Sequence, residues 1–164
     1  MEGEGGASGE GLIVRKIEEG TVIDHVEPGK SFTILKVLGL LDEPGDKRIS
    51  VVVNAESRKM GRKDIVKIEG LYLRPDEADF IAVISPRATI NVIRGGWVVE
   101  KRRVSPPRRV EGILACPNPT CISRKEREPV KPVMELVDSQ GPVYRCIYCG
   151  TLVKPWDIPR LVNV

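Results

Sequence analysis

The chain has 164 residues, 30% of them charged and only 4% aromatic, and 26 Lys and Arg against 23 Asp and Glu leave a net charge of +3. Non-specific nucleic-acid binders usually carry a larger basic excess and more stacking rings, so the composition disfavours that class. No apolar run reaches the roughly 18 residues of a membrane helix, and residues 1–11 lack the features of a signal peptide. We therefore predict a cytoplasmic protein without a membrane partner.

The N-terminal part alternates between strand and helix patterns. Residues 1–11 consist almost entirely of Gly, Glu, Ser and Ala, so we expect a flexible tail that cannot bury enough apolar surface to order itself. Ser31 is a candidate helix cap, and Gly20 is expected to break the first strand. The predicted elements are strands over 12–19 and 21–26, a helix over 32–41, and strands over 48–55 and 62–69.

The next elements complete a recognisable order. A helix is predicted to begin near Pro75, because proline followed by acidic residues suits a helix N-terminus, and to end at Ser85. Strands over 88–94 and 97–103 should form a hairpin across two glycines. The order β-α-β-β-α-β plus one strand predicts a ferredoxin-like domain over residues 12–104.

A second, smaller module follows the linker at residues 105–109, where two adjacent prolines stiffen the chain. Short strands are predicted over 110–115, 131–138, 143–145 and 151–153. The last residues, from Trp156 onward, carry no clear secondary-structure signal. Residues 110–164 should therefore form a small all-β, rubredoxin-like domain, giving an α+β chain in total.

Cys116, Cys121, Cys146 and Cys149 are the only cysteines, and they are spaced as C-x4-C and C-x2-C. Two close pairs separated by a loop predict one tetrahedral Zn²⁺ site with four thiolate ligands. Buried free cysteines or two disulfides are the alternatives. A zinc with four protein ligands has no open position for a substrate, so we expect it to stabilise the small domain and not to catalyse a reaction.

No catalytic constellation is evident elsewhere. His25 is the only histidine, and the sequence contains no G-x-S-x-G, Walker A or H-E-x-x-H motif. Because all four cysteines are assigned to the metal, no thiolate nucleophile remains. We therefore expect a binding or regulatory protein and not an enzyme.

A zinc-ribbon protein that binds nucleic acid is the alternative function. Its support is a set of basic residues around the linker and the zinc loop: Lys101, Arg102, Arg103, Arg108, Arg109, Arg124, Lys125 and Arg127. Glu126 and Glu128 interrupt the second group, which favours a solvated face or a surface for an acidic partner. We expect no nucleic-acid partner.

Three stretches resemble the regulatory chain of aspartate carbamoyltransferase, in the same order and over most of the chain. They are GTVIDH at residues 20–25, MGRKDIVKIE at 60–69 and CPNPTCIS at 116–123. The resemblance implies a non-catalytic chain of pyrimidine biosynthesis whose N-terminal domain binds CTP or ATP, with or without Mg²⁺. It also implies that the zinc domain contacts the catalytic chain, and that regulatory homodimers join an assembly of six catalytic and six regulatory chains.

The resemblance also implies a nucleotide site in the N-terminal domain. Lys67 and Lys101 would place ammonium groups on triphosphate oxygens, His25 would donate to a phosphate, and Asp24 would accept from ribose hydroxyls. A lone histidine in a strand is more often structural, so the role of His25 depends on the motif around it. The whole predicted site comprises Val14, Arg15, Lys16, Ile17, Asp24, His25, Lys63, Lys67, Asn91, Ile93, Val98 and Lys101.

Overall fold

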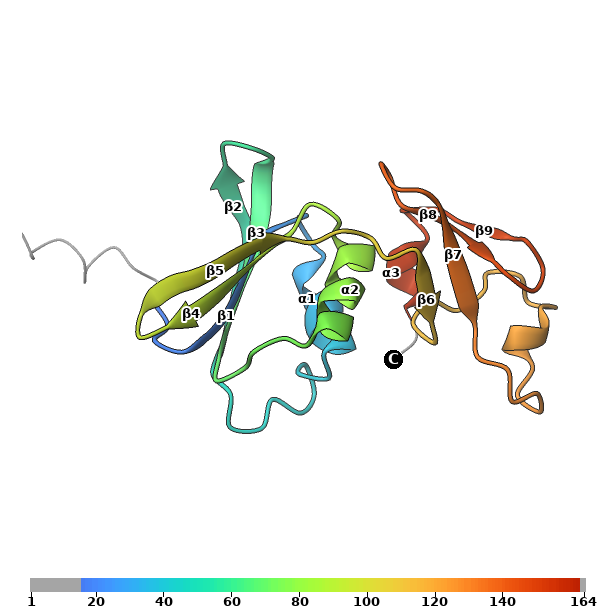
Figure 1. Ribbon diagram of the computed structural model, residues 1–164, viewed down its shortest axis with the longest axis horizontal. Coiled ribbons are helices and arrows are strands. Elements are labelled where there is room, and N and C mark those ends of the chain that lie inside the picture. Colours follow the sequence, from blue (N-terminus) through green and yellow to red (C-terminus); the bar gives the residue numbers. More distant parts are fainter. Residues whose placement is uncertain (1–15, 163–164) are drawn as a thin grey trace, which may run out of the picture.

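Two antiparallel sheets organise the computed structural model, which describes residues 16–162 (Figure 1). The predicted tail, the first part of the predicted strand over 12–19, and the predicted site residues Val14 and Arg15 lie outside the described residues. Among the residues described, no helix is long and apolar enough to cross a membrane.

The first sheet carries the ferredoxin-like order that the sequence predicted. Its strands lie in the order β2-β3-β1-β4-β5, and every neighbouring pair is antiparallel. Two helices connect the strands of the split βαβ units. The elements are β1 (Gly20–Val26), α1 (Ser31–Val37), β2 (Ile49–Ser57), β3 (Gly61–Glu69), α2 (Pro75–Ile84), β4 (Thr89–Arg94) and β5 (Trp97–Arg103).

Three predictions in this domain are wrong. Ser31 does not cap α1 but is its first residue, after Lys30 at the N-cap. The strand predicted over 12–19 is absent from residues 16–19, and Gly20 begins β1 instead of breaking a strand. A Cβ at Gly20 would lie 2.2 Å from the Ile68 carbonyl oxygen, so only glycine allows this approach to β3. Helix α1 ends at Val37, not Leu41, because Gly39 takes a left-handed φ of +71° and Leu40 N–H returns to the Leu35 carbonyl.

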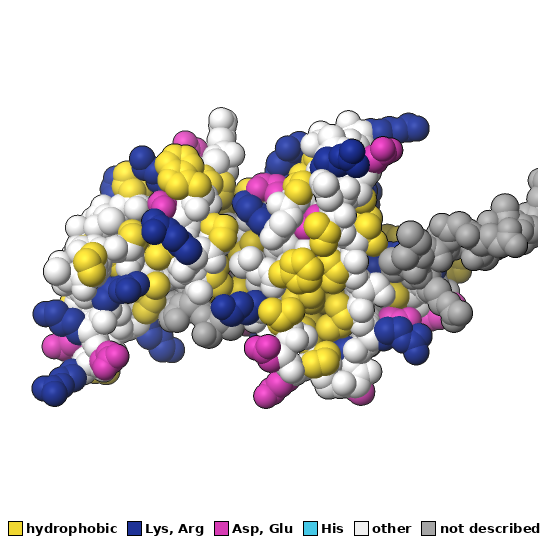
Figure 2. Space-filling model, turned by 180° about the vertical axis from the view of Figure 1, so that it is seen from behind, with side chains coloured by type: hydrophobic (Ala, Val, Ile, Leu, Met, Phe, Trp, Pro, Cys, Tyr) yellow, Lys and Arg dark blue, Asp and Glu magenta, His cyan; other side chains and the backbone are white. Residues whose placement is uncertain are grey.

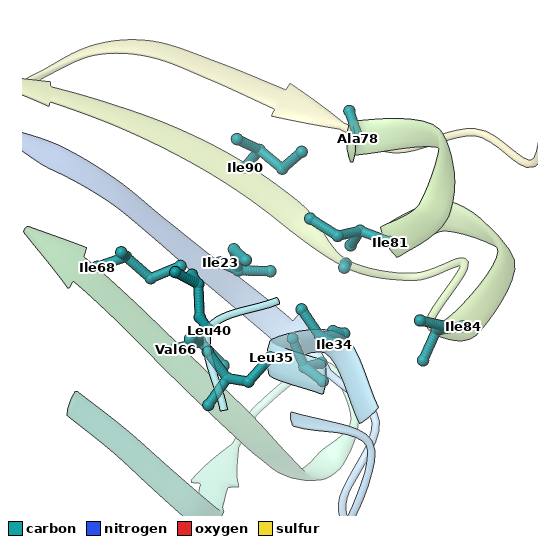
Figure 3. Packing of buried hydrophobic residues seen from close by; sticks show 12 residues of the cluster. Ile23, Ile34, Leu35, Leu40, Val66, Ile68, Ala78, Ile81, Ile84 and Ile90 are labelled. Atoms are coloured by element: carbon teal, nitrogen blue, oxygen red, sulfur yellow. The ribbon is translucent and has the colours of Figure 1, made fainter. Parts of the chain in front are cut away.

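Both helices cover the same face of the sheet. Ile23, Val66 and Ile90 from the strands pack against isoleucines and leucines of α1 and α2 in one buried cluster (Figure 3). Because side chains alternate along a strand, their neighbours in sequence point to the opposite face. On that helix-free face, Lys67, Val22, Asn91 and Lys101 are paired across β3, β1, β4 and β5 in one row.

The second sheet belongs to the cysteine-rich part of the chain. It has the order β6-β7-β8-β9, again antiparallel throughout. The first strand is shorter than the predicted 110–115, because Gly112 turns the chain with a φ of +73°. The elements are β6 (Arg109–Glu111), a 3-10 turn (Ile122–Arg124), β7 (Val133–Asp138), β8 (Val143–Cys146), β9 (Leu152–Val153) and α3 (Ile158–Leu161).

Helix α3, which the sequence pattern did not predict, packs between the second domain and helix α2 of the first domain. Ile158 and Leu161 are buried with Val83 of α2 in the core of the second domain, so α2 contributes to both cores. The Ala115 N–H donates to the Leu161 carbonyl at 2.8 Å. The segment that follows the last strand therefore packs on α2, and α3 lies beside α2 in Figure 1.

Asp64 is a fully buried carboxylate that ties three segments of the N-terminal domain together. One oxygen accepts from Asn54 N–H at 2.8 Å, at a position where Asn54 adopts a φ of +62° and interrupts the register of β2. The other accepts from Gly29 N–H at 3.0 Å and from the hydroxyl of Ser31, at the start of α1, at 2.7 Å. This carboxylate thus fixes the first helix against the bulge of β2.

We expect Asp64→Ala to lower the free energy of unfolding by about 2–4 kcal/mol, because several buried donors would lose a charged acceptor. Denaturant unfolding followed by circular dichroism measures this change. Asp46→Ala is the matched control, since the Asp46 side chain is 95% exposed and should change stability little. Equal unfolding midpoints for both variants would contradict this role of Asp64.

Candidate functional sites

The four cysteine sulfurs converge at one point of the second domain. All four Sγ atoms lie within 4.8 Å of one another. Cys116 and Cys149 are 3.5 Å apart at sulfur, and Cys121 and Cys146 are 3.7 Å apart. Disulfides need about 2.05 Å, so the disulfide alternative is excluded, whereas thiolates around Zn²⁺ at about 2.3 Å would lie about 3.8 Å apart. The cluster therefore has the size of a tetrahedral metal site.

Tight turns place each pair of ligands. In the second pair, Gly150 adopts a φ of +78° and its N–H donates to the Cys146 carbonyl at 2.9 Å. In the first pair, Cys121 N–H donates to the Asn118 carbonyl at 3.1 Å. Arg124 then reaches back to the Cys116 carbonyl at 3.2 Å. These local bonds present all four sulfurs to one centre.

The cysteines differ in their proton affinity. Burial raises the pKa of the Cys116 and Cys146 thiols. The pKa of Cys149 is lowered to about 6, chiefly by its hydrogen bond with the Thr151 hydroxyl, which lies 3.2 Å from the sulfur. A metal must therefore displace protons from the buried thiols, and its binding free energy contributes to folding.

We expect the purified chain to hold one zinc, and Cys149→Ser to lose it. Without metal the small second core should open, because it is too small to be stable alone. Metal analysis measures the zinc, and hydrogen exchange should then report lost protection in β7 and β8 but not in β1 and β3. The control Ser139→Ala, at an exposed turn, should keep its zinc. Full zinc retention by Cys149→Ser would contradict the assignment.

Exposed apolar side chains surround the cysteine cluster. Ile122 follows Cys121 directly, and Ile147 and Tyr148 lie between the ligands of the second pair. Each of these three side chains is between 40% and 43% exposed. Such a group beside a rigid metal site is typical of a protein-binding surface.

The helix-free face of the first sheet carries an apolar cavity of about 460 Å³. Ile17, Val22, Ile93 and Val98 supply most of its apolar wall, and the β4–β5 turn closes one side. Five further residues line the cavity: Lys16, Lys67, Asn91, Gly96 and Trp97. The predicted residues Lys16, Ile17, Lys67, Asn91, Ile93 and Val98 are therefore brought together.

A second cavity of about 280 Å³ lies at the other end of the same strands, and basic residues dominate its walls. It contains the predicted residues His25 and Lys101. Asn91, which lines the apolar cavity, is the strand partner of Lys101, so the two cavities adjoin on one face. The remaining lining residues are Lys59, Met60, Arg87, Thr89 and Arg103.

The predicted residues Asp24 and Lys63 line neither cavity but bind each other. Lys63 Nζ lies 3.0 Å from one Asp24 oxygen, and the same carboxylate accepts from the backbone N–H of His25 at 2.6 Å. This bond holds His25 at a φ of +54°, and its Nδ1 lies 3.0 Å from the Thr89 hydroxyl. Burial, followed by the charges of the neighbouring lysines, lowers the pKa of His25.

Several cavity residues were absent from the predicted set. Strand register could have found two of them: Val22 pairs with Lys67 and Asn91, and Thr89 pairs with Asp24. Lys59 and Arg87 carry no comparable signal, because only the folded hairpin brings them to His25.

Comparison with known proteins identifies the family. Residues 12–105 match the family model of the aspartate carbamoyltransferase regulatory chain, allosteric domain, and residues 108–158 match its metal binding domain. The chain is similar to proteins named aspartate carbamoyltransferase regulatory chain from three organisms. It is 59% identical to that of Hyperthermus butylicus over 92% of this chain and 94% of the relative, 53% identical to that of Aeropyrum pernix over 94% and 98%, and 52% identical to that of Staphylothermus marinus over 93% and 92%.

The two matches leave few residues uncovered and agree with the two sheets and the cysteine cluster described above. The chain belongs to the family of aspartate carbamoyltransferase regulatory chains.

Proposed function

We propose that this allosteric regulatory chain is non-catalytic, that it binds CTP or ATP on the helix-free face of its first sheet, and that its metal domain, holding Zn²⁺, binds the catalytic chain. The observation that carries the nucleotide part is the adjoining pair of cavities, one apolar and one basic. A nucleoside triphosphate is divided in the same way. Its base is flat and weakly polar, whereas its phosphates are anionic.

In this proposal the base lies in the apolar cavity and the phosphates extend toward Lys101 and His25. Lys67 lies in the row between the two cavities, where its ammonium group is suited to the ribose or the first phosphate. Asp24 is bound by Lys63, so we propose that it orients that lysine and the His25 backbone in addition to accepting from a ribose hydroxyl. Val14 and Arg15 remain predicted members of the site.

We expect Lys101→Ala to weaken CTP binding at least tenfold, because one charge-assisted contact with a phosphate contributes about 1.5–3 kcal/mol. Isothermal titration of the full chain with CTP measures this change. Lys36→Ala is the matched control, because Lys36 lies on α1, which packs on the covered face of the sheet. Unchanged affinity in Lys101→Ala would rule out this phosphate position.

The catalytic chain is proposed to dock on the apolar side chains around the cysteine cluster. The metal fixes the turns that carry Ile122, Ile147 and Tyr148, so their position depends on zinc. Apolar residues at the centre of an interface contribute most of its binding free energy.

We expect Ile147→Asp to weaken assembly with the catalytic chain by at least tenfold while the chain keeps its zinc, since a charge would be buried in the interface. Mass measurement of the mixed chains, combined with metal analysis, tests this. Trp97→Asp serves as the control, because Trp97 is exposed and begins β5 at the end of the molecule remote from the second sheet (Figure 1). Normal assembly of Ile147→Asp would refute this docking surface.

The quaternary arrangement is also a proposal. Strand β2 is an edge of the first sheet, and Phe32, Leu41 and Val53 of the same domain are 51%, 45% and 44% exposed, which supports a homodimer contact on this domain. Figure 2 shows hydrophobic side chains gathered on the face of this domain seen from behind. We propose homodimers within an assembly of six catalytic and six regulatory chains.

Reduced cysteines around a metal favour a cytoplasmic location.

A further inference from the structure

The basic cavity holds more positive charge than the predicted residues alone would give it. Lys59, Arg87, Lys101 and Arg103 all line it, and they come from three separate segments of the sheet. His25 lies among them at the end of β1. Within residues 16–162, no acidic side chain lines this cavity. Four permanent cations therefore face one ligand space of about 280 Å³.

A specific contact brings Lys59 to the cavity. The Arg87 guanidinium donates to the Lys59 carbonyl at 3.4 Å and so joins the β2–β3 turn to the turn between α2 and β4. Within the turn, Met60 N–H donates to the Ser57 hydroxyl at 3.2 Å. Arg87 thus contributes its own charge and also helps to hold the backbone that carries the Lys59 ammonium group.

Two carboxylates of the neighbouring segments are already engaged. Asp24 is bound by Lys63 at 3.0 Å and by the N–H of His25. Asp64 is fully buried and accepts from Gly29, Ser31 and Asn54. Protein sites for Mg²⁺-nucleotide complexes usually hold the metal through one or two carboxylates. Neither Asp24 nor Asp64 is available for that purpose, and no carboxylate lines the basic cavity within residues 16–162.

The charges match a triphosphate that carries no metal. Such a group has a charge of about −4 near neutral pH, because each phosphate carries at least one negative charge and the last carries nearly two. Bound Mg²⁺ would halve that charge and would itself be repelled by the four cations. Burial is the main cause of the lowered pKa of His25, and the charges of Lys63, Lys59 and Lys101 lower it further, which agrees with the basic character of the cavity.

We propose that this site selects the metal-free nucleoside triphosphate, with Lys59 and Arg87 providing the charge neutralisation that Mg²⁺ provides in other nucleotide sites. The inference rests on the proposed nucleotide function and specifies the form of the effector. It also assigns binding roles to two residues outside the predicted site.

Titration of the full chain with CTP tests the proposal. One titration uses a buffer free of divalent cations other than the bound zinc, and the other contains enough Mg²⁺ to convert nearly all CTP into its Mg²⁺ complex. Both have the same ionic strength, because salt alone weakens charge contacts. No chelator is added, since it would attack the cysteine site. We expect binding at least tenfold weaker with Mg²⁺.

Variants connect the effect to the two residues. Lys59→Ala combined with Arg87→Ala should weaken metal-free CTP at least tenfold and abolish the preference over the Mg²⁺ complex. Lys59→Gln alone, which leaves the Arg87 contact with the backbone intact, should give a smaller change in the same direction. Arg58→Ala is the matched control: it lies on the same turn but faces a different surface depression.

The possible failures are distinguishable. Equal or tighter binding of the Mg²⁺ complex by the unaltered chain would overturn the proposed preference for the metal-free triphosphate while leaving the nucleotide function intact. Binding of neither CTP nor ATP under either condition would overturn the nucleotide function itself. A preference for metal-free CTP that persists in the double variant would overturn the roles of Lys59 and Arg87.

Discussion

The packing of both helices on one face of the five-stranded sheet is the constraint on which the rest of the structure depends. It buries Ile23, Val66 and Ile90 in the core and leaves their strand neighbours uncovered on the other face. Uncovered strands can carry ligand-binding side chains without disturbing the core. The apolar cavity and the basic cavity both lie there, so the packing that stabilises the domain also leaves open the face on which we propose that the nucleotide binds.

The second domain needs a source of stability other than its core, because it is small and two strands of its sheet are very short. A metal held by the cysteine cluster would supply the cross-link that the small core cannot, and the same turns expose the apolar side chains that we propose as the docking surface for the catalytic chain. Helix α2 contributes Ile81 to the first core and Val83 to the second. A displacement of α2 on the sheet would therefore change the packing of the metal domain directly. Such a displacement would be a physical route between an effector and the catalytic chain.

Much of this could be predicted from the sequence, because its strongest signals are local. The cysteine spacing predicted the metal cluster, and helix α2 followed from Pro75 and the acidic residues after it. The boundary at Gly20 could not be predicted, since it depends on an approach to Ile68 far along the chain. The same holds for Lys59 and Arg87, which only a contact between two turns brings together. Long-range contacts, and not weak propensities, account for these omissions.

The central claim is that a ligand on the open sheet face regulates an enzyme bound through the metal domain. The most direct measurement compares the rate of aspartate carbamoylation, with and without CTP, in complexes of the catalytic chain with either the unaltered chain or a Lys67→Ala Lys101→Ala variant. We expect complexes of equal mass, with a CTP effect only in the first. A CTP effect of the same size in the variant complex, or in the catalytic chain alone, would contradict it.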